Sequence, residues 1–139
     1  RFPAGPRLYP GDARARARIR RLVREAEVYL DLEALDPITT EYFGKDGAEP
    51  DLDRVAKARV RLGEELDYFT RELRAPFLAG DAPTAADFVL YPWGGYVERI
   101  AFRRPETRLT QLLTPALSEW AQRIEGLSYF DKTFPPHWR

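Results

Sequence analysis

Apolar residues recur at helical spacing in several stretches of the chain. In the first stretch, Asp12 can cap a helix that begins at Ala13, with apolar positions at Ile19, Leu22, Val23, Ala26 and Leu30. The second stretch predicts a long helix from Leu52 to Leu73, which Pro76 and Gly80 terminate. Its expected core stripe is Leu52, Val55, Leu62, Leu66, Phe69 and Leu73.

The third stretch is apolar on nearly every side. Residues 88–93 read Phe-Val-Leu-Tyr-Pro-Trp, so a helix from Ala85 should lie at the centre of the fold. Pro92 and the pair Gly94–Gly95 predict an interruption and a kink, with the helix resuming toward Ile100.

A shorter helix is predicted after Thr114–Pro115, which reads as a cap followed by proline at the first helical position. Its buried face would hold Leu117, Trp120, Ala121 and Ile124, and Gly126 would end it. Loop-like composition marks Asp36–Pro37, Thr39–Pro50, the turn Arg103–Glu106 and the tail at Pro135–Pro136. No strand-like alternation appears in the sequence, so we predict an all-α bundle of about five helices over residues 12–139.

The start of the central helix carries the most specific local pattern. Gly80 and Asp81 turn the chain, Thr84 reads as the N-cap, and Asp87 stands three positions later, where its carboxylate can reach back to the cap N–H. Pro83 and Phe88 flank the pair as a hydrophobic staple. Because Thr84 and Asp87 are both committed to the helix end, we predict a structural rather than a catalytic role for them.

This pattern also resembles a known family. Gly80-Asp81-x-x-Thr84-x-Ala86-Asp87, opening an apolar helix, is similar to the C-terminal all-helical domain of glutathione transferases, where the corresponding Thr and Asp cap the core helix. Tyr9–Pro10 before an Arg-rich helix, and Leu127–Phe130 near the end, resemble further parts of bacterial members. The resemblance covers nearly all of the 139 residues.

The resemblance implies a function that needs more than these residues. Family members start with a thioredoxin-like domain, from which residues 1–11 would be a linker, and that domain carries the Ser, Tyr or Cys that activates the thiol of glutathione. The expected cosubstrate is therefore glutathione, the substrate a small hydrophobic electrophile and the assembly a homodimer. No catalytic residue is expected in this chain, which should be inactive alone. The electrophile and the choice among transferase, peroxidase and isomerase chemistry stay open.

The same resemblance suggests three site residues. Glu27 falls where an acidic side chain can bind the γ-glutamyl ammonium of the partner subunit's glutathione. Tyr29 and Tyr96 fall where side chains line the electrophile pocket, whereas Trp93 is expected in the core. The structural alternatives are a surface ion pair for Glu27 and a packing role for Tyr29. The arginines between Arg14 and Arg24 are read as a solvated face paired with nearby acids, with contact to a glutathione carboxylate as the alternative.

Composition limits which partners, cellular compartments and metal sites can be expected. Equal numbers of basic and acidic residues, 22 each, argue against a nucleic-acid or anionic-membrane partner, and no apolar run is long enough to span a membrane. The absence of cysteine excludes disulfides and is compatible with a cytoplasmic protein. His137 alone is a poor metal site, so no metal is expected. Two alternatives remain: a non-catalytic interaction module related to glutathione transferases, and an unrelated helical bundle.

Overall fold

The computed structural model describes residues 5, 7–44, 48–73 and 76–133. Within these ranges the chain is helical and forms no strand, which confirms the all-α prediction. The elements in order are α1 (Ala13–Glu25), the π-helix η1 (Ala26–Leu35), α2 (Asp36–Phe43), α3 (Leu52–Glu72), α4 (Ala85–Arg103), the 3₁₀ turns η2 (Pro105–Thr107) and η3 (Leu109–Leu112), α5 (Pro115–Glu125) and α6 (Phe130–Thr133).

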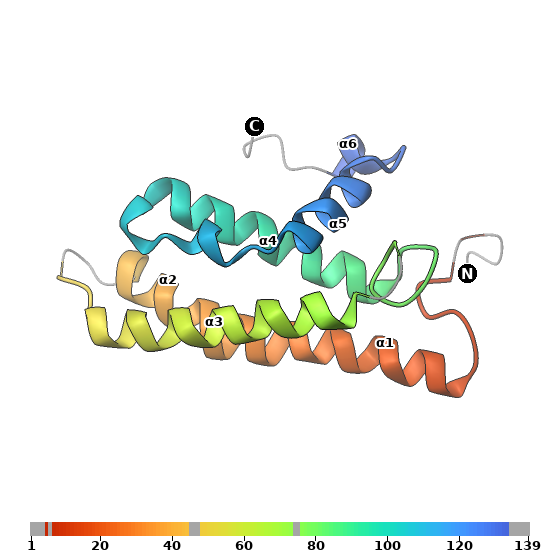
Figure 1. Cartoon of the computed structure of the whole chain (residues 1–139), viewed down its shortest axis with the longest axis horizontal. Helices are drawn as coiled ribbons and strands as arrows, with labels where there is room; N and C mark the ends of the chain where they lie inside the picture. The colour runs from red at the N-terminus through yellow and green to blue at the C-terminus, as the bar shows by residue number, and fades with distance from the viewer. Residues whose placement is uncertain (1–4, 6, 45–47, 74–75, 134–139) are drawn as a thin grey trace.

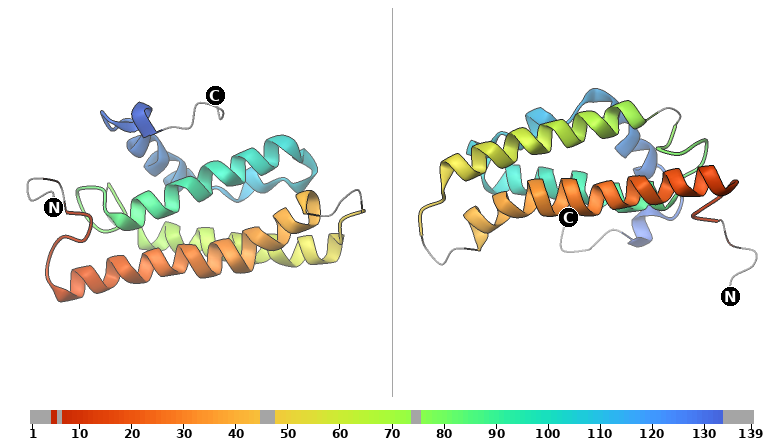
Figure 2. Two further views of the ribbon diagram at one scale, coloured as in Figure 1. Left: turned by 180° about the vertical axis from the view of Figure 1, so that it is seen from behind. Right: turned by 90° about the horizontal axis from the view of Figure 1, so that it is seen from below.

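The first helical stretch and α3 lie side by side, and α4 runs along them and packs on the first helical stretch (Figures 1 and 2). After α4 the chain turns back through η2 and η3, and α5 then rises away from the bundle toward α6 (Figure 1). Because α4 contacts α1, η1, α5 and both 3₁₀ turns, it is the central helix that the sequence predicted.

The first helical stretch is longer than predicted. Asp12 caps α1 by accepting a hydrogen bond from the Ala15 N–H at 2.8 Å, as expected. Helical structure then continues through η1 into α2, so the loop predicted at Asp36–Pro37 and over 39–43 is wrong. Pro37 is tolerated because it lies in the first turn of α2, where a proline costs the helix little.

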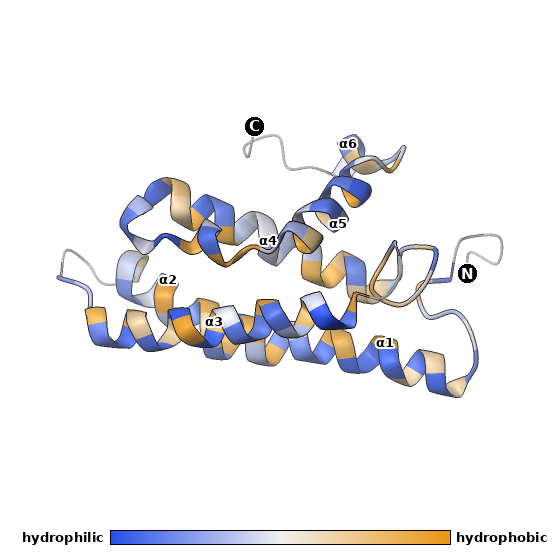
Figure 3. Cartoon of the chain, viewed as in Figure 1, coloured by the Kyte–Doolittle hydropathy of each residue, from blue (hydrophilic) through white to orange (hydrophobic). Residues whose placement is uncertain are grey.

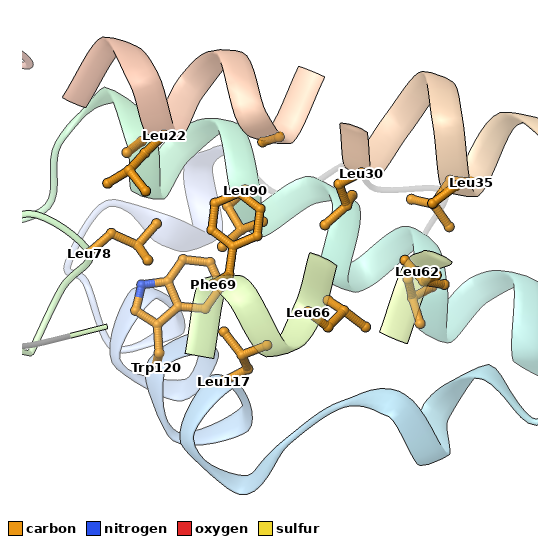
Figure 4. Packing of buried hydrophobic residues seen from close by; sticks show 14 of the residues in the cluster. Leu22, Leu30, Leu35, Leu62, Leu66, Phe69, Leu78, Leu90, Leu117 and Trp120 are labelled. Atoms are coloured by element: carbon orange, nitrogen blue, oxygen red, sulfur yellow. The ribbon is translucent and has the colours of Figure 1, made fainter. Parts of the chain in front are cut away.

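The core gathers leucines and aromatic rings from every long helix. Figure 4 shows Leu22 and Leu30 of the first stretch facing Leu66 and Phe69 of α3, with Trp120 of α5 closing the end. Orange apolar residues alternate with blue polar ones along α1 and α3 in Figure 3, which is the amphipathic pattern read from the sequence. One predicted core residue is misplaced: Leu52 is 65% exposed, since it lies at the first position of α3, beyond the covering helices.

The central helix is unbroken. The interruption predicted at Pro92 and Gly94–Gly95 is wrong, because Ala85–Arg103 is one α-helix that includes Pro92. Such a proline removes a single i→i−4 hydrogen bond, and the surrounding packing keeps the helix intact. Farther along, the helix after Thr114 is confirmed: the Thr114 hydroxyl accepts from the Leu117 N–H at 3.3 Å. The predicted tail at Pro135–Pro136 and His137 lie outside the described residues.

Three ion pairs, at the two ends of α3, join that helix to α1 and α2. Arg18 and Arg21 of α1 both bind the Glu72 carboxylate of α3, at 3.1 and 2.9 Å. At the other end, Glu41 of α2 is buried and accepts from the Arg54 guanidinium at 2.9 Å and from the Asp51 N–H at 2.8 Å. Part of the arginine-rich face is therefore engaged with the neighbouring helix rather than with acids of its own helix.

Candidate functional site

The amino end of α4 is held by the Asp87 carboxylate, which also binds two other parts of the chain, and by one backbone hydrogen bond to Leu8. Asp87 is fully buried, and its Oδ2 accepts from the Thr84 N–H at 2.8 Å and from the Thr84 hydroxyl at 2.9 Å, within the predicted capping box. The Ala85 N–H donates to the Leu8 carbonyl at 3.0 Å. The N–H groups of Thr84 and Ala85 are thus satisfied inside the protein, as a central helix requires.

The second oxygen of Asp87 makes contacts that the sequence did not reveal. Its Oδ1 accepts from the Leu78 N–H at 2.8 Å and from the Trp120 indole N–H at 3.0 Å. One carboxylate therefore joins the loop before α4, the α4 cap and the core ring of α5. The capping pattern is local in sequence, whereas the Trp120 contact spans 33 positions, so the pattern could not predict this contact.

The residues proposed from the family resemblance on the first helical stretch both lie on η1. The Glu27 carboxylate forms an ion pair of 3.5 Å with Arg24 and stays partly exposed. The Tyr29 side chain is 39% exposed, and the Arg61 guanidinium lies 5.5 Å from its ring centroid. Both side chains can still reach a bound molecule on this face, and their roles in binding stay predictions.

Tyr96 lies on α4, apart from those two residues. It is half-buried, and its ring packs edge-on against Trp93 at a centroid distance of 6.2 Å. Trp93 contributes to the partly buried layer over the core, close to its predicted position. Among the described residues no ring contact joins Tyr29 to Tyr96, so the structure does not bring the two tyrosines directly together.

A pocket of about 350 Å³ opens elsewhere, between α4 and α5. Its apolar wall combines one residue of α3, one of α4, one of the segment before α5 and two of α5: Leu66, Leu90, Leu113, Leu117 and Trp120. Glu27, Tyr29 and Tyr96 do not line it. Sequence reasoning missed this pocket because its two sides come from helices whose packing no local pattern specifies.

The polar side of this pocket is acidic. Glu98 of α4 and Glu125 at the end of α5 line it, and no Lys or Arg does. The Tyr91 hydroxyl donates to Glu125 Oε1 at 2.9 Å. Burial, then the hydrogen bond to Glu125, raises the pKa of the Tyr91 hydroxyl well above its ordinary value, so it remains a donor at neutral pH.

Across residues 5, 7–44, 48–73 and 76–133, no three His, Cys, Asp or Glu side chains gather where they could hold a metal ion. Nor does any helix in these ranges have the length and apolar character needed to cross a membrane.

Comparison with solved structures finds the same arrangement in larger proteins. The chain superposes on a glutathione S-transferase from Rhodospirillum rubrum F11 with a TM-score of 0.71 and 25% identity, covering 96% of this chain and 63% of that one. A glutathione S-transferase from Sinorhizobium meliloti 1021 gives a TM-score of 0.72 at 22% identity, covering 90% and 55%. FzlA from C. crescentus gives 0.70 at 23% identity, covering 94% and 59%.

The chain therefore spans less than two thirds of the length of these solved structures. No curated protein matches the sequence. The sequence does match the family described as glutathione S-transferase, C-terminal domain, over residues 24–127, which include the capping box and both sides of the α4–α5 pocket. The chain accordingly belongs to the glutathione S-transferase C-terminal domain family.

Proposed function

We propose that this chain is the substrate-binding part of a cytoplasmic glutathione transferase. In the complete protein, the sulfur of glutathione would attack a small hydrophobic electrophile held against this domain. A thiol with an ordinary pKa near 8.5 is mostly protonated at neutral pH, so a residue outside these positions must favour the thiolate. The family match over residues 24–127 is the observation that carries the proposal.

Within that proposal, the outer face of η1 contacts both substrates. Tyr29 presents a partly exposed ring whose position is restrained by Arg61, which suits a wall of an apolar pocket. Tyr96 would close the same pocket from α4. Glu27 would bind the ammonium of glutathione held by the second subunit of a homodimer, since its present ion pair with Arg24 is long and partly exposed.

The test is steady-state kinetics of the complete protein with glutathione and a chlorinated nitroaromatic. Tyr29→Ala and Tyr96→Ala should change kcat/KM by different factors for electrophiles of different size, while the unfolding midpoint moves little. Tyr129→Ala is the matched control, because Tyr129 is similarly exposed, at 42%, and lies near the C-terminal end. Glu27→Gln should raise the KM for glutathione and leave electrophile preference unchanged.

Two outcomes would contradict this function. If the complete protein neither binds immobilised glutathione nor conjugates any tested electrophile, the enzyme assignment fails and the interaction module replaces it. If it is active but the two tyrosine variants match Tyr129→Ala for every substrate, the pocket lies elsewhere.

A further inference from the structure

One end of the bundle carries the most exposed apolar side chains in the described part of the chain. These are Phe102, which is 88% exposed, and Leu52, which is 65% exposed. Phe102 is the last residue but one of α4, and Leu52 is the first residue of α3. The two helix ends lie together at one end of the molecule, with α2 beside them (Figures 1 and 2). We propose that this end binds the same end of a second copy of the chain.

The first half of the proposed contact is basic. Phe102 is followed by two exposed arginines, and we call these three residues, Phe102, Arg103 and Arg104, the basic edge. The Arg103 guanidinium lies 4.9 Å from the centroid of the Phe43 ring. The Arg104 guanidinium lies 5.4 Å from the centroid of the Tyr42 ring and donates to the Tyr42 carbonyl at 3.4 Å. Because these contacts already restrain both side chains, binding a carboxylate costs them less conformational entropy.

The second half of the proposed contact is acidic. Leu52 lies between Glu49 and Asp53, which are both exposed, and we call these three residues the acidic edge. Asp51 is left out because its carboxylate caps α3 by accepting from the Arg54 N–H at 3.0 Å. Each edge therefore combines one exposed apolar side chain with two exposed charges of a single sign.

The charges of the two edges are not neutralised within one copy. Among the described residues, no ion pair within 4.0 Å includes Arg103, Arg104, Glu49 or Asp53. A two-fold axis at this end would place the basic edge of each copy against the acidic edge of the other. Such a contact is self-complementary and closes on itself, as in most homodimers.

The charge distribution favours a second copy over other partners. The chain has no net charge, so two copies do not repel each other at long range. A nucleic acid or an anionic membrane would be attracted by the basic edge and repelled by the acidic edge. Only one end of the bundle takes part, so we expect less buried surface than the roughly 800 Å² per partner of a standard stable complex. The association should therefore be weak and should decrease as salt screens the exposed charges.

The experiment is sedimentation equilibrium of the purified chain at increasing concentration, up to on the order of 1 mM. We expect reversible dimerisation whose association constant falls several-fold between about 50 and about 500 mM sodium chloride. Phe102→Ser should weaken the dimer, and the exposure of Phe102 means that the variant should fold. Circular dichroism checks the folding of every variant.

Charge reversal tests the pairing of the edges. The basic-edge variant is Arg103→Glu/Arg104→Glu, and the acidic-edge variant is Glu49→Lys/Asp53→Lys. Each alone should weaken self-association at least roughly tenfold, because the exposed ion pairs of both contacts become repulsions. An equimolar mixture of the two variants should restore it, because the reversed edges then face each other and the unchanged edges also face each other.

The matched control is Arg71→Glu/Lys132→Glu, which makes the same change in net charge at exposed residues of α3 and α6, outside both edges. It should dimerise nearly as well as the wild-type chain, and mixing it with the acidic-edge variant should restore nothing. A chain that stays monomeric, a control that weakens dimerisation as much as the basic-edge variant, or a mixture of edge variants that does not associate would each overturn the proposal. A dimer that neither edge variant affects would also overturn it, while leaving open the homodimer through Glu27. None of these readouts depends on glutathione, so failure here is distinguishable from failure of the proposed enzyme.

Discussion

Replacing Asp87 with alanine removes the acceptor for four hydrogen bonds, of which three come from N–H groups that cannot turn elsewhere: those of Leu78, Thr84 and Trp120. Each buried donor left without a partner costs about 1–3 kcal/mol, and the Thr84 hydroxyl can rotate toward another acceptor. We therefore expect Asp87→Ala to lower the free energy of unfolding by on the order of 5 kcal/mol, a large part of the roughly 5–15 kcal/mol typical of a domain.

Asp87→Asn distinguishes the contributions of the two carboxylate oxygens to stability. Its remaining carbonyl oxygen can still accept from Leu78 and Trp120, while its NH₂ group faces the Thr84 N–H. We expect about half the loss of the alanine variant. Urea unfolding followed by circular dichroism measures both variants, and if Asp87→Ala does not fold, Asp87→Asn and Thr84→Ala still provide the measurement.

Asp12→Ala is the matched control for this experiment. Asp12 also caps a helix, but it is exposed and accepts a single N–H bond, so its loss should cost about 1 kcal/mol. If Asp87→Ala and Asp12→Ala cost the same, the buried Leu78 and Trp120 contacts contribute nothing and the reasoning above is refuted.

Other substitutions test neighbouring parts of the structure. Thr84→Ala should cost about 1 kcal/mol in urea unfolding, and a neutral result would show that the hydroxyl is dispensable. Gly94→Ala should stabilise α4 by about 0.5–1 kcal/mol, since the added methyl meets nothing; a loss would mean that the space is filled. Glu41→Ala should cost about 2 kcal/mol, because the Asp51 N–H and Arg54 lose their acceptor. Burial raises the pKa of Glu65, whose Oε2 lacks a hydrogen-bond partner, although Arg61 opposes the shift. Because the folded protein then holds this proton more tightly than the unfolded chain, the wild-type protein should lose stability as pH rises above 4.5. Glu65→Gln should lose less stability over the same pH range. Unfolding of the wild-type protein and of Glu65→Gln is measured at pH 4 and at pH 7.5. If the two proteins differ in free energy of unfolding by the same amount at both pH values, the ionisation of Glu65 does not affect stability.

The features that sequence predicted well are those that depend on neighbours in the chain. Asp12, Thr84 and Thr114 each cap the helix assigned to them, because a cap involves only the next three or four residues. Pro37 and Pro92 were misread for a related reason: a proline lowers local helix propensity, but packing against other helices decides whether the helix continues.

The candidate sites also combine features set by neighbours in the chain with features set by helix packing. The capping role of Asp87 was evident from its spacing to Thr84, whereas its bond to Trp120 depends on how α5 docks. Tyr91, Gly95 and Glu98 share one face of α4, but they line a pocket only because α5 supplies the opposite wall. A sequence can indicate such a face, and only the folded chain shows what lies across from it.

The π-helical segment η1 has a consequence for comparing this protein with its relatives. Its hydrogen bonds run from residue i to i+5, as in the Asp36 N–H to Asp31 carbonyl bond, so each hydrogen-bonded ring encloses one more residue than in an α-helix. Equivalent positions before and after Ala26–Leu35 therefore do not keep a constant separation when a relative has a regular helix here. Against such a relative, an alignment that allows gaps only in loops would shift the residues on one side of η1 against their counterparts, and the gap would belong inside the helix.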